Sequence, residues 1–150
     1  MPETNKLRST ALAWLGRQEY SLHKFCEKLK KYEATEEQIE LILEEFCQNN
    51  WLCEQRYCDA YVRGRVNKGQ GKIRIRADAR TKRLDQDIVS ESLNKAEVDW
   101  FEQARATYDK RYGDKPIKDI KEKAKRLRFM QYRGFTMDEV NFAMNNNDDE

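Results

Sequence analysis

The sequence repeats itself with a period of about fifty residues, and this period constrains the fold more than any other feature. Residue types that begin helices recur at Thr35, Asp85 and Thr136, at offsets of 50 and 51 residues. An apolar residue precedes each of them and another follows four residues later; the pairs are Ala34 with Ile39, Leu84 with Val89, and Phe135 with Val140. Because a Thr or Asp oxygen accepts from the first free amides of a helix, and such an apolar pair packs across its start, each position predicts a helix. Three helices that start alike predict three copies of one structural unit.

Apolar residues one helical turn apart predict the other helices of each unit. Leu22, Phe25, Cys26 and Leu29 form one such stripe, and Ile39, Ile42, Leu43 and Phe46 form another. Only two prolines and six glycines interrupt the 150 residues, which favours helices joined by short connections. We expect helices near residues 6–18, 21–32, 35–49, 54–68, 71–82, 85–94, 97–112, 116–132 and 136–145.

The predicted fold class is therefore all-α, with three tandem three-helix repeats forming an elongated, curved array. We expect the first repeat at 1–52, the second at 53–95, and the third at 96–150 with an acidic C-terminal tail. A unit of this size leaves an apolar edge that only its neighbour covers, so interfaces between neighbours should supply much of the stability. Trp14, Trp51 and Trp100 are expected to pack in the cores or between repeats rather than to stack on bases.

Charge is sorted along the chain although the net charge is only +2. Residues 33–54 contain acidic side chains and no Lys or Arg, so the third helix should carry an acidic face. The charged residues within 63–83 are all Lys or Arg except Asp78. A second stretch rich in Lys and Arg spans 115–133. Each run has two interpretations: a solvated helix face, or a strip that meets a phosphate backbone or an acidic protein surface.

Few residues suit catalysis or metal binding. His23 is the only histidine, and its neighbours Leu22, Lys24 and Phe25 give it no orienting carboxylate. The four cysteines, Cys26, Cys47, Cys53 and Cys58, form no CxxC pair, which favours free thiols over a zinc site. No apolar run approaches the roughly 20 residues that span a bilayer. We expect no enzyme activity, no metal, no cofactor and no membrane span.

Three motifs carry a family resemblance. The middle repeat contains Leu52, Arg56, Tyr57, Tyr61, Arg65, Lys68, Gly69, Gly71, Arg74, Ile75 and Arg76. Residues 129–135 read FMQYRGF, and residues 12–21 read LAWLGRQEYS. Together they resemble the motifs of the three repeats of the RecX family, regulators of the RecA recombinase. The chain departs from that pattern at Cys53, where an acid is usual and a weaker helix cap is expected, at Lys72, where a proline is common, and at Arg83, where a glycine is usual. A left-handed Arg83 would cost roughly 1 kcal/mol.

The resemblance implies a non-catalytic, cytoplasmic, monomeric modulator that binds the RecA filament on single-stranded DNA. Such a protein lodges in the filament groove and inhibits recombinase, ATPase and co-protease activities, and so modulates DNA repair and the SOS response. The resemblance leaves undecided whether such a protein also contacts the DNA directly and weakly. The alternative is a stand-alone helical nucleic-acid-binding module in which the 63–83 strip tracks phosphates.

The candidate partner-binding residues are the cations of the two basic stretches: Arg63, Arg65, Lys68, Lys72, Arg74, Arg76, Arg80, Lys123, Arg126 and Arg133. Arg74 and Arg76 lie two residues apart on one helix and point in different directions. We therefore expect one of the two to reach a partner and the other to brace the helix junction at Gly69–Gly71. Glu40 and Glu44 of the acidic helix are expected to face a basic surface of the recombinase.

Overall fold

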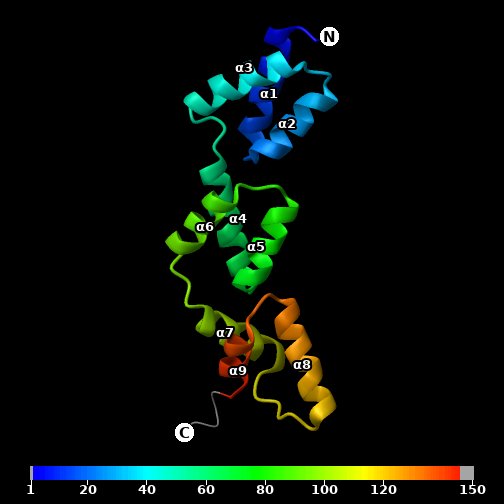
Figure 1. The fold of residues 1–150 in the computed structure, drawn as a ribbon, viewed down its shortest axis with the longest axis vertical. Coiled ribbons are helices and arrows are strands. Elements are labelled where there is room, and N and C mark those ends of the chain that lie inside the picture. Colours follow the sequence, from blue (N-terminus) through cyan, green and yellow to red (C-terminus); the bar gives the residue numbers. More distant parts are fainter. Residues whose placement is uncertain (1, 146–150) are drawn as a thin grey trace.

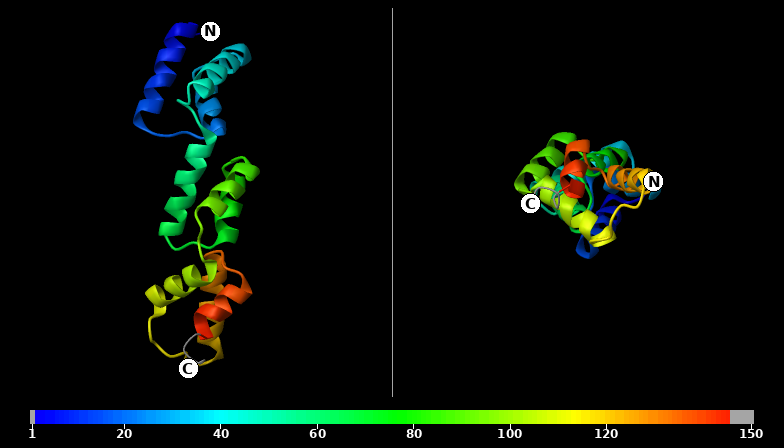
Figure 2. Two further views of the ribbon diagram at one scale, coloured as in Figure 1. Left: turned by 90° about the vertical axis from the view of Figure 1, so that its left-hand side faces the viewer. Right: turned by 90° about the horizontal axis from the view of Figure 1, so that it is seen from below.

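The computed structural model describes residues 2–145, and the regular secondary structure among these residues is entirely α-helical. The helices are α1 (Thr4–Arg17), α2 (Leu22–Lys31), α3 (Glu36–Gln48), α4 (Glu54–Asn67), α5 (Lys72–Thr81), α6 (Gln86–Lys95), α7 (Trp100–Tyr112), α8 (Ile120–Tyr132) and α9 (Met137–Asn145). They group into three bundles of three, which stack end to end along one axis (Figures 1 and 2). The all-α class and the elongated array of repeats are confirmed. The acidic tail residues Asp148, Asp149 and Glu150 lie outside the described residues.

The predicted helix starts at the fifty-residue period are present. Thr35 accepts a hydrogen bond from the Gln38 amide, and the Gln38 side chain accepts in return from the Thr35 amide. Thr136 and Glu139 form the same reciprocal pair in the third repeat. Each capping box satisfies two amides that the first helical turn leaves free, so both helices begin at a fixed residue.

The second repeat replaces the capping box with a carboxylate from another helix. Asp85 caps α6 through the amides of the next turn, but Ile88 occupies the third position and has no side-chain acceptor. Glu54, buried at the start of α4, accepts instead from the Asp85 amide at 3.2 Å. Its other oxygen accepts at 2.8 Å from the amide of Leu22, in the first repeat. Glu54 therefore joins the first and second repeats while it completes the start of α6.

Each repeat has its own apolar core. Phe25 and Leu29 are fully buried in the first core, and the residues fifty positions later, Ile75 and Ala79, are fully buried in the second. Trp14 lies in the first core, and Trp100 packs against the second core from the start of α7 in the third repeat. The prediction of packing roles is confirmed for these two tryptophans, and Trp100 is an inter-repeat contact.

Helix boundaries differ from the prediction where aspartates cap later than expected. α7 begins at Trp100 rather than 97 because Asp99 accepts from the Phe101 and Glu102 amides. α8 begins at Ile120 rather than 116 because Asp119 caps it. The connection before α8 is therefore longer than the corresponding turns of the first two repeats.

The helix ends expected from the departures in the family pattern are also present. Cys53 precedes α4 and supplies no side-chain cap. Arg83 has a φ of 59°, and the equivalent residues of the other repeats, Glu33 and Gly134, have φ values of 63° and 102°. All three repeats thus leave their second helix through a left-handed residue, and only the third uses glycine.

Candidate partner-binding surface

The basic stretch of the second repeat is partly consumed by internal contacts. The Arg65 guanidinium donates to Asp78 Oδ2 at 2.6 Å and to Gln70 Oε1 at 2.8 Å, and it lies over the Tyr61 ring. Burial alone would raise the pKa of Asp78, but the hydrogen bonds and charges of Arg65 and Arg74 outweigh it and hold the pKa below its usual value. Arg65 therefore connects α4 to α5, and its charge is already paired.

Arg74 and Arg133 brace the junction between the second and third repeats. Arg74 on α5 donates to the Tyr132 carbonyl at the end of α8, at 3.3 Å, and its guanidinium lies 4.5 Å from the centre of the Tyr132 ring. Arg133 donates back across the junction to the Lys68 carbonyl. Arg74 thus braces the junction between the second and third repeats, whereas the sequence predicted such a role at the Gly69–Gly71 junction between two helices.

Two glycines allow the backbones to meet at this junction. The Gly71 amide donates to the Arg133 carbonyl at 2.8 Å, and the Ile73 amide donates to the Gly134 carbonyl at 3.1 Å. A Cβ on Gly71 would overlap the Gly134 carbonyl, and a Cβ on Gly134 would lie 2.5 Å from the Arg74 amide nitrogen. Both positions therefore require glycine for the two repeats to dock.

α7 supplies two further links that the sequence reasoning missed. Gln103 donates to the Val66 carbonyl at 2.7 Å, and Thr107 donates to the Gly69 carbonyl at 2.9 Å. The Val66 carbonyl also accepts from the Gly69 amide, so Gln103 gives it a second hydrogen bond, and Thr107 supplies a donor to the Gly69 carbonyl just beyond α4. The sequence could have indicated these links, because Gln103 and Thr107 lie one helical turn apart, on the side of α7 that also carries the buried Ala104.

Arg126 was a candidate partner-binding residue, but its side chain is buried and has a structural role. Only 3% of the residue is exposed, and it donates to the Tyr108 hydroxyl at 2.7 Å and to Glu122 at 2.7 Å. It also donates to the Lys115 carbonyl, which ties α8 to the connection before it. A guanidinium held in this way is not presented to a partner.

Six of the candidate cations remain available on the surface. Arg63, Lys68, Arg80 and Lys123 are exposed, and Lys72 and Arg76 are half-buried. None of the six forms an ion pair with the residues that the structure describes. These side chains are free to meet an anionic surface.

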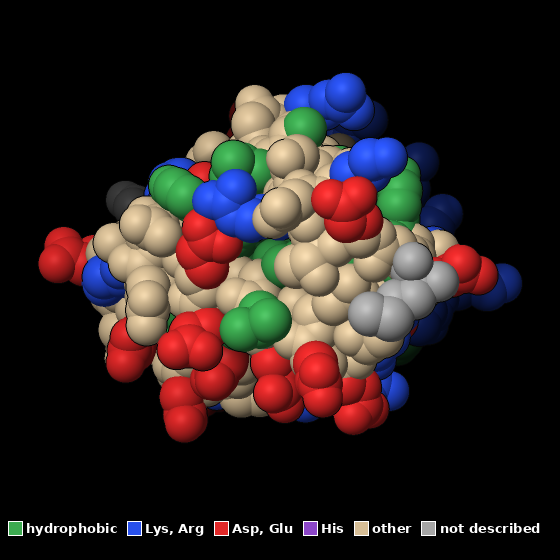
Figure 3. Space-filling model, turned by 90° about the horizontal axis from the view of Figure 1, so that it is seen from above, with side chains coloured by type: hydrophobic (Ala, Val, Ile, Leu, Met, Phe, Trp, Pro, Cys, Tyr) green, Lys and Arg blue, Asp and Glu red, His purple; other side chains and the backbone are tan. Residues whose placement is uncertain are grey.

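Helix α3 of the first repeat carries the opposite charge. Glu36, Glu37, Glu40 and Glu44 are exposed on α3. Acidic side chains gather along one edge of the N-terminal end of the molecule (Figure 3). Glu45 differs, because it accepts from Arg8 Nε at 2.7 Å and this hydrogen bond lowers its pKa. The acidic helix α3 and the exposed cations of α4 and α5 thus offer surfaces of different sign.

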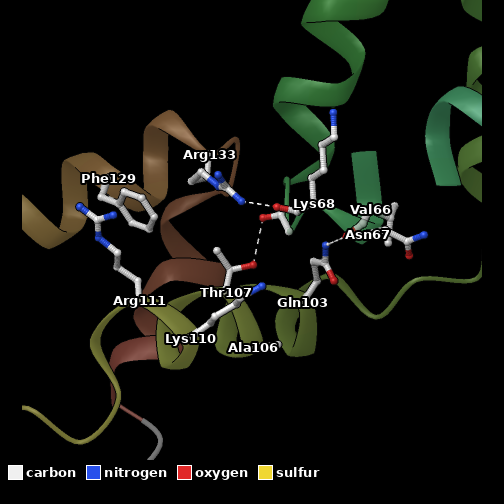
Figure 4. A pocket seen from close by; sticks show the side chains of 11 residues that line it. Val66, Asn67, Lys68, Gln103, Ala106, Thr107, Lys110, Arg111, Phe129 and Arg133 are labelled. Carbon is white, nitrogen blue, oxygen red and sulfur yellow. Dashed lines mark hydrogen bonds between the residues drawn. The ribbon is translucent and has the colours of Figure 1, made fainter. Parts of the chain in front are cut away.

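A cavity of about 440 Å³ lies at the braced junction, between the end of α4, α7 and α8 (Figure 4). Lys68, Lys110, Arg111 and Arg133 line it, and no acid is present among its described lining residues. Lys110 and Arg111 lie between the two basic stretches, and the sequence reasoning did not select them. Folding brings them to Lys68 and Arg133.

The surroundings of the residues weighed for catalysis and metal binding, His23 and the cysteines, are described within residues 2–145. No group of three or more His, Cys, Asp or Glu side chains there could hold a metal ion. His23 has Glu27 as its ionic neighbour, at 3.7 Å. Burial is the main cause that raises the pKa of the Cys58 thiol, to about 12. No helix of the described part of the chain is both long and apolar enough to cross a membrane.

Comparison with known families agrees with this architecture. The family model of the second three-helix domain of RecX matches residues 54–93, and the model of the third three-helix domain matches residues 97–144. The chain is 35% identical to the regulatory protein RecX of Acinetobacter baylyi, over 97% of this chain and 90% of that relative. It is 32% identical to the regulatory protein RecX of Vibrio parahaemolyticus, over 95% of this chain and 92% of that relative.

A tandem array of three-helix domains with braced junctions is the class of protein that the fold defines. Within that class, the chain belongs to the RecX family. The crystal structure of RecX from Lactobacillus salivarius superposes with a TM-score of 0.82 at 20% identity, over 98% of this chain and 97% of that one. At this identity the match supports the common fold.

Proposed function

We propose that the chain is a regulatory protein that binds the RecA nucleoprotein filament on single-stranded DNA and inhibits its recombinase, ATPase and co-protease activities. In this role it acts without catalysis of its own, as a cytoplasmic monomer, and modulates DNA repair and the SOS response. The observation that carries the proposal is membership of the RecX family along almost the whole chain.

The braced junctions support a role on a repeating partner. Glu54 fixes the first repeat to the second, and the contacts among Gly71, Arg74 and Gly134 fix the second to the third. An array held in this way offers three modules at a constant spacing. Successive protomers of a filament also lie at a constant spacing, so several weak contacts would gain from being linked.

The separated charges support an orientation on that partner. Exposed cations such as Arg63, Arg80 and Lys123 lie on the second and third repeats, and exposed acids such as Glu40 lie on the first. In the proposed complex the cations approach an acidic groove or DNA, and the acidic helix α3 faces a basic recombinase surface. Complementary charge of this kind raises association rates and makes binding sensitive to salt.

A pull-down on RecA filaments tests the proposal. Filaments are assembled on immobilised single-stranded DNA with a non-hydrolysable ATP analogue, and bare DNA on the same support is the control. The proposal expects the chain to be retained by the filament well above the amount retained by bare DNA. Equal retention on the two supports would contradict it.

The second candidate function is a stand-alone helical nucleic-acid-binding module. The observation that favours it is the set of cations on α4 and α5, including Arg63 and Arg80, that form no ion pair with any residue of 2–145. Such a module would bind bare single strands tightly, with affinity that falls steeply as salt rises, because bound counterions are released. Reversal of Glu40 and Glu44 separates the two functions: it should tighten binding to bare DNA and weaken binding to the filament.

A further inference from the structure

Helices α3 and α5 each carry three side chains of one charge, at every fourth residue. This spacing aligns them in a row along one face of the helix. The acid row on α3 and the cation row on α5 consist of Glu36, Glu40 and Glu44, and of Lys72, Arg76 and Arg80. No other row of three like charges with this spacing occurs in helices α1–α9. The two rows have opposite sign and lie in different repeats, α3 in the first and α5 in the second (Figure 1).

Both rows lack a counter-charge within residues 2–145. The three acids and Arg80 are exposed, Lys72 and Arg76 are half-buried, and none of the six forms an ion pair there. Like charges four residues apart repel each other and destabilise the helix that carries them. A surface of opposite charge laid along either row would remove this repulsion.

An exposed apolar side chain borders each row. Leu41 directly follows Glu40 and is 61% exposed, and Ile73 directly follows Lys72 and is 53% exposed. A partner that covers such a face would bury this apolar surface while it pairs with the charges. The two faces thus match each other in length, in spacing and in the place of their apolar side chain, and they differ in sign.

The ends of the two helices favour an antiparallel contact between them. The first turn of α5 contains the cation Lys72 and no acid, and the last turn of α3 contains no base. Because the start of a helix is partly positive and its end partly negative, neither of these ends has a favourable charge beside it. With the helices antiparallel, Glu44 would approach the start of α5 and Lys72 the end of α3, so each helix would supply the charge that the other lacks.

The apolar side chains favour the same direction. Each directly follows a residue of its row, so Leu41 and Ile73 lie on the same side of their rows when each helix is viewed along its chain direction. Two antiparallel helices with facing rows bring these sides to a common edge, where Leu41 and Ile73 can pack together. Two parallel helices would place them at opposite edges.

From this arrangement we propose that the acid row of one copy of this chain binds the cation row of a second copy, with α3 and α5 antiparallel. The expected ion pairs are Glu36 with Arg80, Glu40 with Arg76, and Glu44 with Lys72. A nucleic-acid backbone would match the cation row alone, and it would leave the acid row and Leu41 without a partner.

This contact is weak, because it rests on one short helix from each copy. α5 has ten residues and is about 15 Å long, so the pair of helices buries less than the roughly 1,200 Å² of a stable interface. The chain is therefore monomeric when dilute, and copies associate where they are concentrated, as on a shared partner. The acid row then meets a second copy rather than a recombinase surface. The test needs no recombinase, so its failure would leave the proposed function standing.

Sedimentation equilibrium of the full chain at low salt tests the contact. The weight-average mass of the wild-type chain should rise with concentration into the millimolar range. It should return to the monomer mass at roughly 1 M salt, where charges are screened within about 3 Å. A monomer mass at every concentration in low salt would overturn the proposal. If the same chain also bound an oligothymidylate and Lys72→Glu abolished that binding, the cation row would belong to a nucleic-acid site instead.

An exchange of charges identifies the residues in contact. Glu44→Lys should weaken association on the order of tenfold, because it places a cation opposite Lys72 of the second copy. Glu44→Lys with Lys72→Glu restores this pair with its signs exchanged, so this double variant should associate as the wild type does. Glu44→Lys with Arg80→Glu has the same net charge and does not restore the pair, so it should associate no better than Glu44→Lys alone.

Two outcomes of this exchange would refute the proposed contact. One is that neither double variant recovers association, and the other is that the variant with Arg80→Glu recovers it in place of the variant with Lys72→Glu. Lys6→Glu, which reverses an exposed charge on α1, is the control and should associate as the wild type does. Circular dichroism spectra equal to that of the wild type would confirm that all variants are folded.

Discussion

Replacing Gly134 by alanine tests the docking of the second and third repeats. Gly134 has a φ of 102°, which a residue with a Cβ adopts at a cost of about 1–2 kcal/mol. The new Cβ would also lie 2.5 Å from the Arg74 amide nitrogen. If the junction stays closed, the overlap costs about 1–3 kcal/mol, and if it opens, two hydrogen bonds of about 1 kcal/mol each are lost. The two contributions together predict a loss of about 2–5 kcal/mol.

Urea unfolding followed by far-ultraviolet circular dichroism measures this loss. Gly64→Ala is the matched control, because Gly64 lies inside helix α4 and a Cβ added there would have no atom within 4 Å beyond its own stretch of the helix. There the same chemical change should stabilise the chain by about 0.5–1 kcal/mol. Because the repeats are coupled through their interfaces, Gly134→Ala should also let the third repeat unfold separately. A Gly134→Ala protein as stable as the wild type would refute the account of the junction.

Three further outcomes follow from individual side chains. Glu54→Gln should cost about 1–3 kcal/mol in the same unfolding assay, because an amide can accept through only one oxygen where the carboxylate accepts two N–H groups. The pKa of Asp78 is lowered in the folded state, so its carboxylate stabilises the fold above the unfolded pKa of about 3.9 and loses this effect as the pH falls through the folded pKa. Asp78→Asn should therefore destabilise the chain at neutral pH and progressively less below about pH 4, and a pH-independent difference would exclude this role. Iodoacetamide should modify the exposed Cys47 in the native protein and the buried Cys58 only after unfolding, as peptide mass spectrometry would reveal.

The repeat architecture could be predicted because its signals are local. A cap such as Thr35 and its apolar partners lie within one helical turn, so the sequence alone identifies the start of the helix. The same holds for the left-handed residue Arg83, which lies at a helix end fixed by the repeat period. Predicted helix starts were wrong where a residue that can cap a helix, such as Asp119, lies further along the chain than the predicted start.

The roles of individual cations could not be predicted from local signals. Arg65, Arg74 and Arg133 read as members of basic stretches, but their partners are an aspartate and backbone carbonyls that only the folded chain brings near. Charge counting along the sequence does not separate these bracing residues from exposed cations such as Arg63. The cavity was missed for the same reason, since Lys110 lies far in sequence from Lys68.

The most direct test of the central claim is the rate of ATP hydrolysis by RecA on single-stranded DNA as the chain is added. The account predicts that the wild-type chain lowers the hydrolysis rate in proportion to the fraction of the filament to which it is bound. Arg63→Glu with Arg80→Glu, which reverses two exposed cations without an ion pair in the described part of the chain, should require roughly tenfold more protein for the same inhibition. Lys6→Glu should behave as the wild type. A hydrolysis rate that stays unchanged in excess wild-type chain would contradict the claim that this protein acts on the RecA filament.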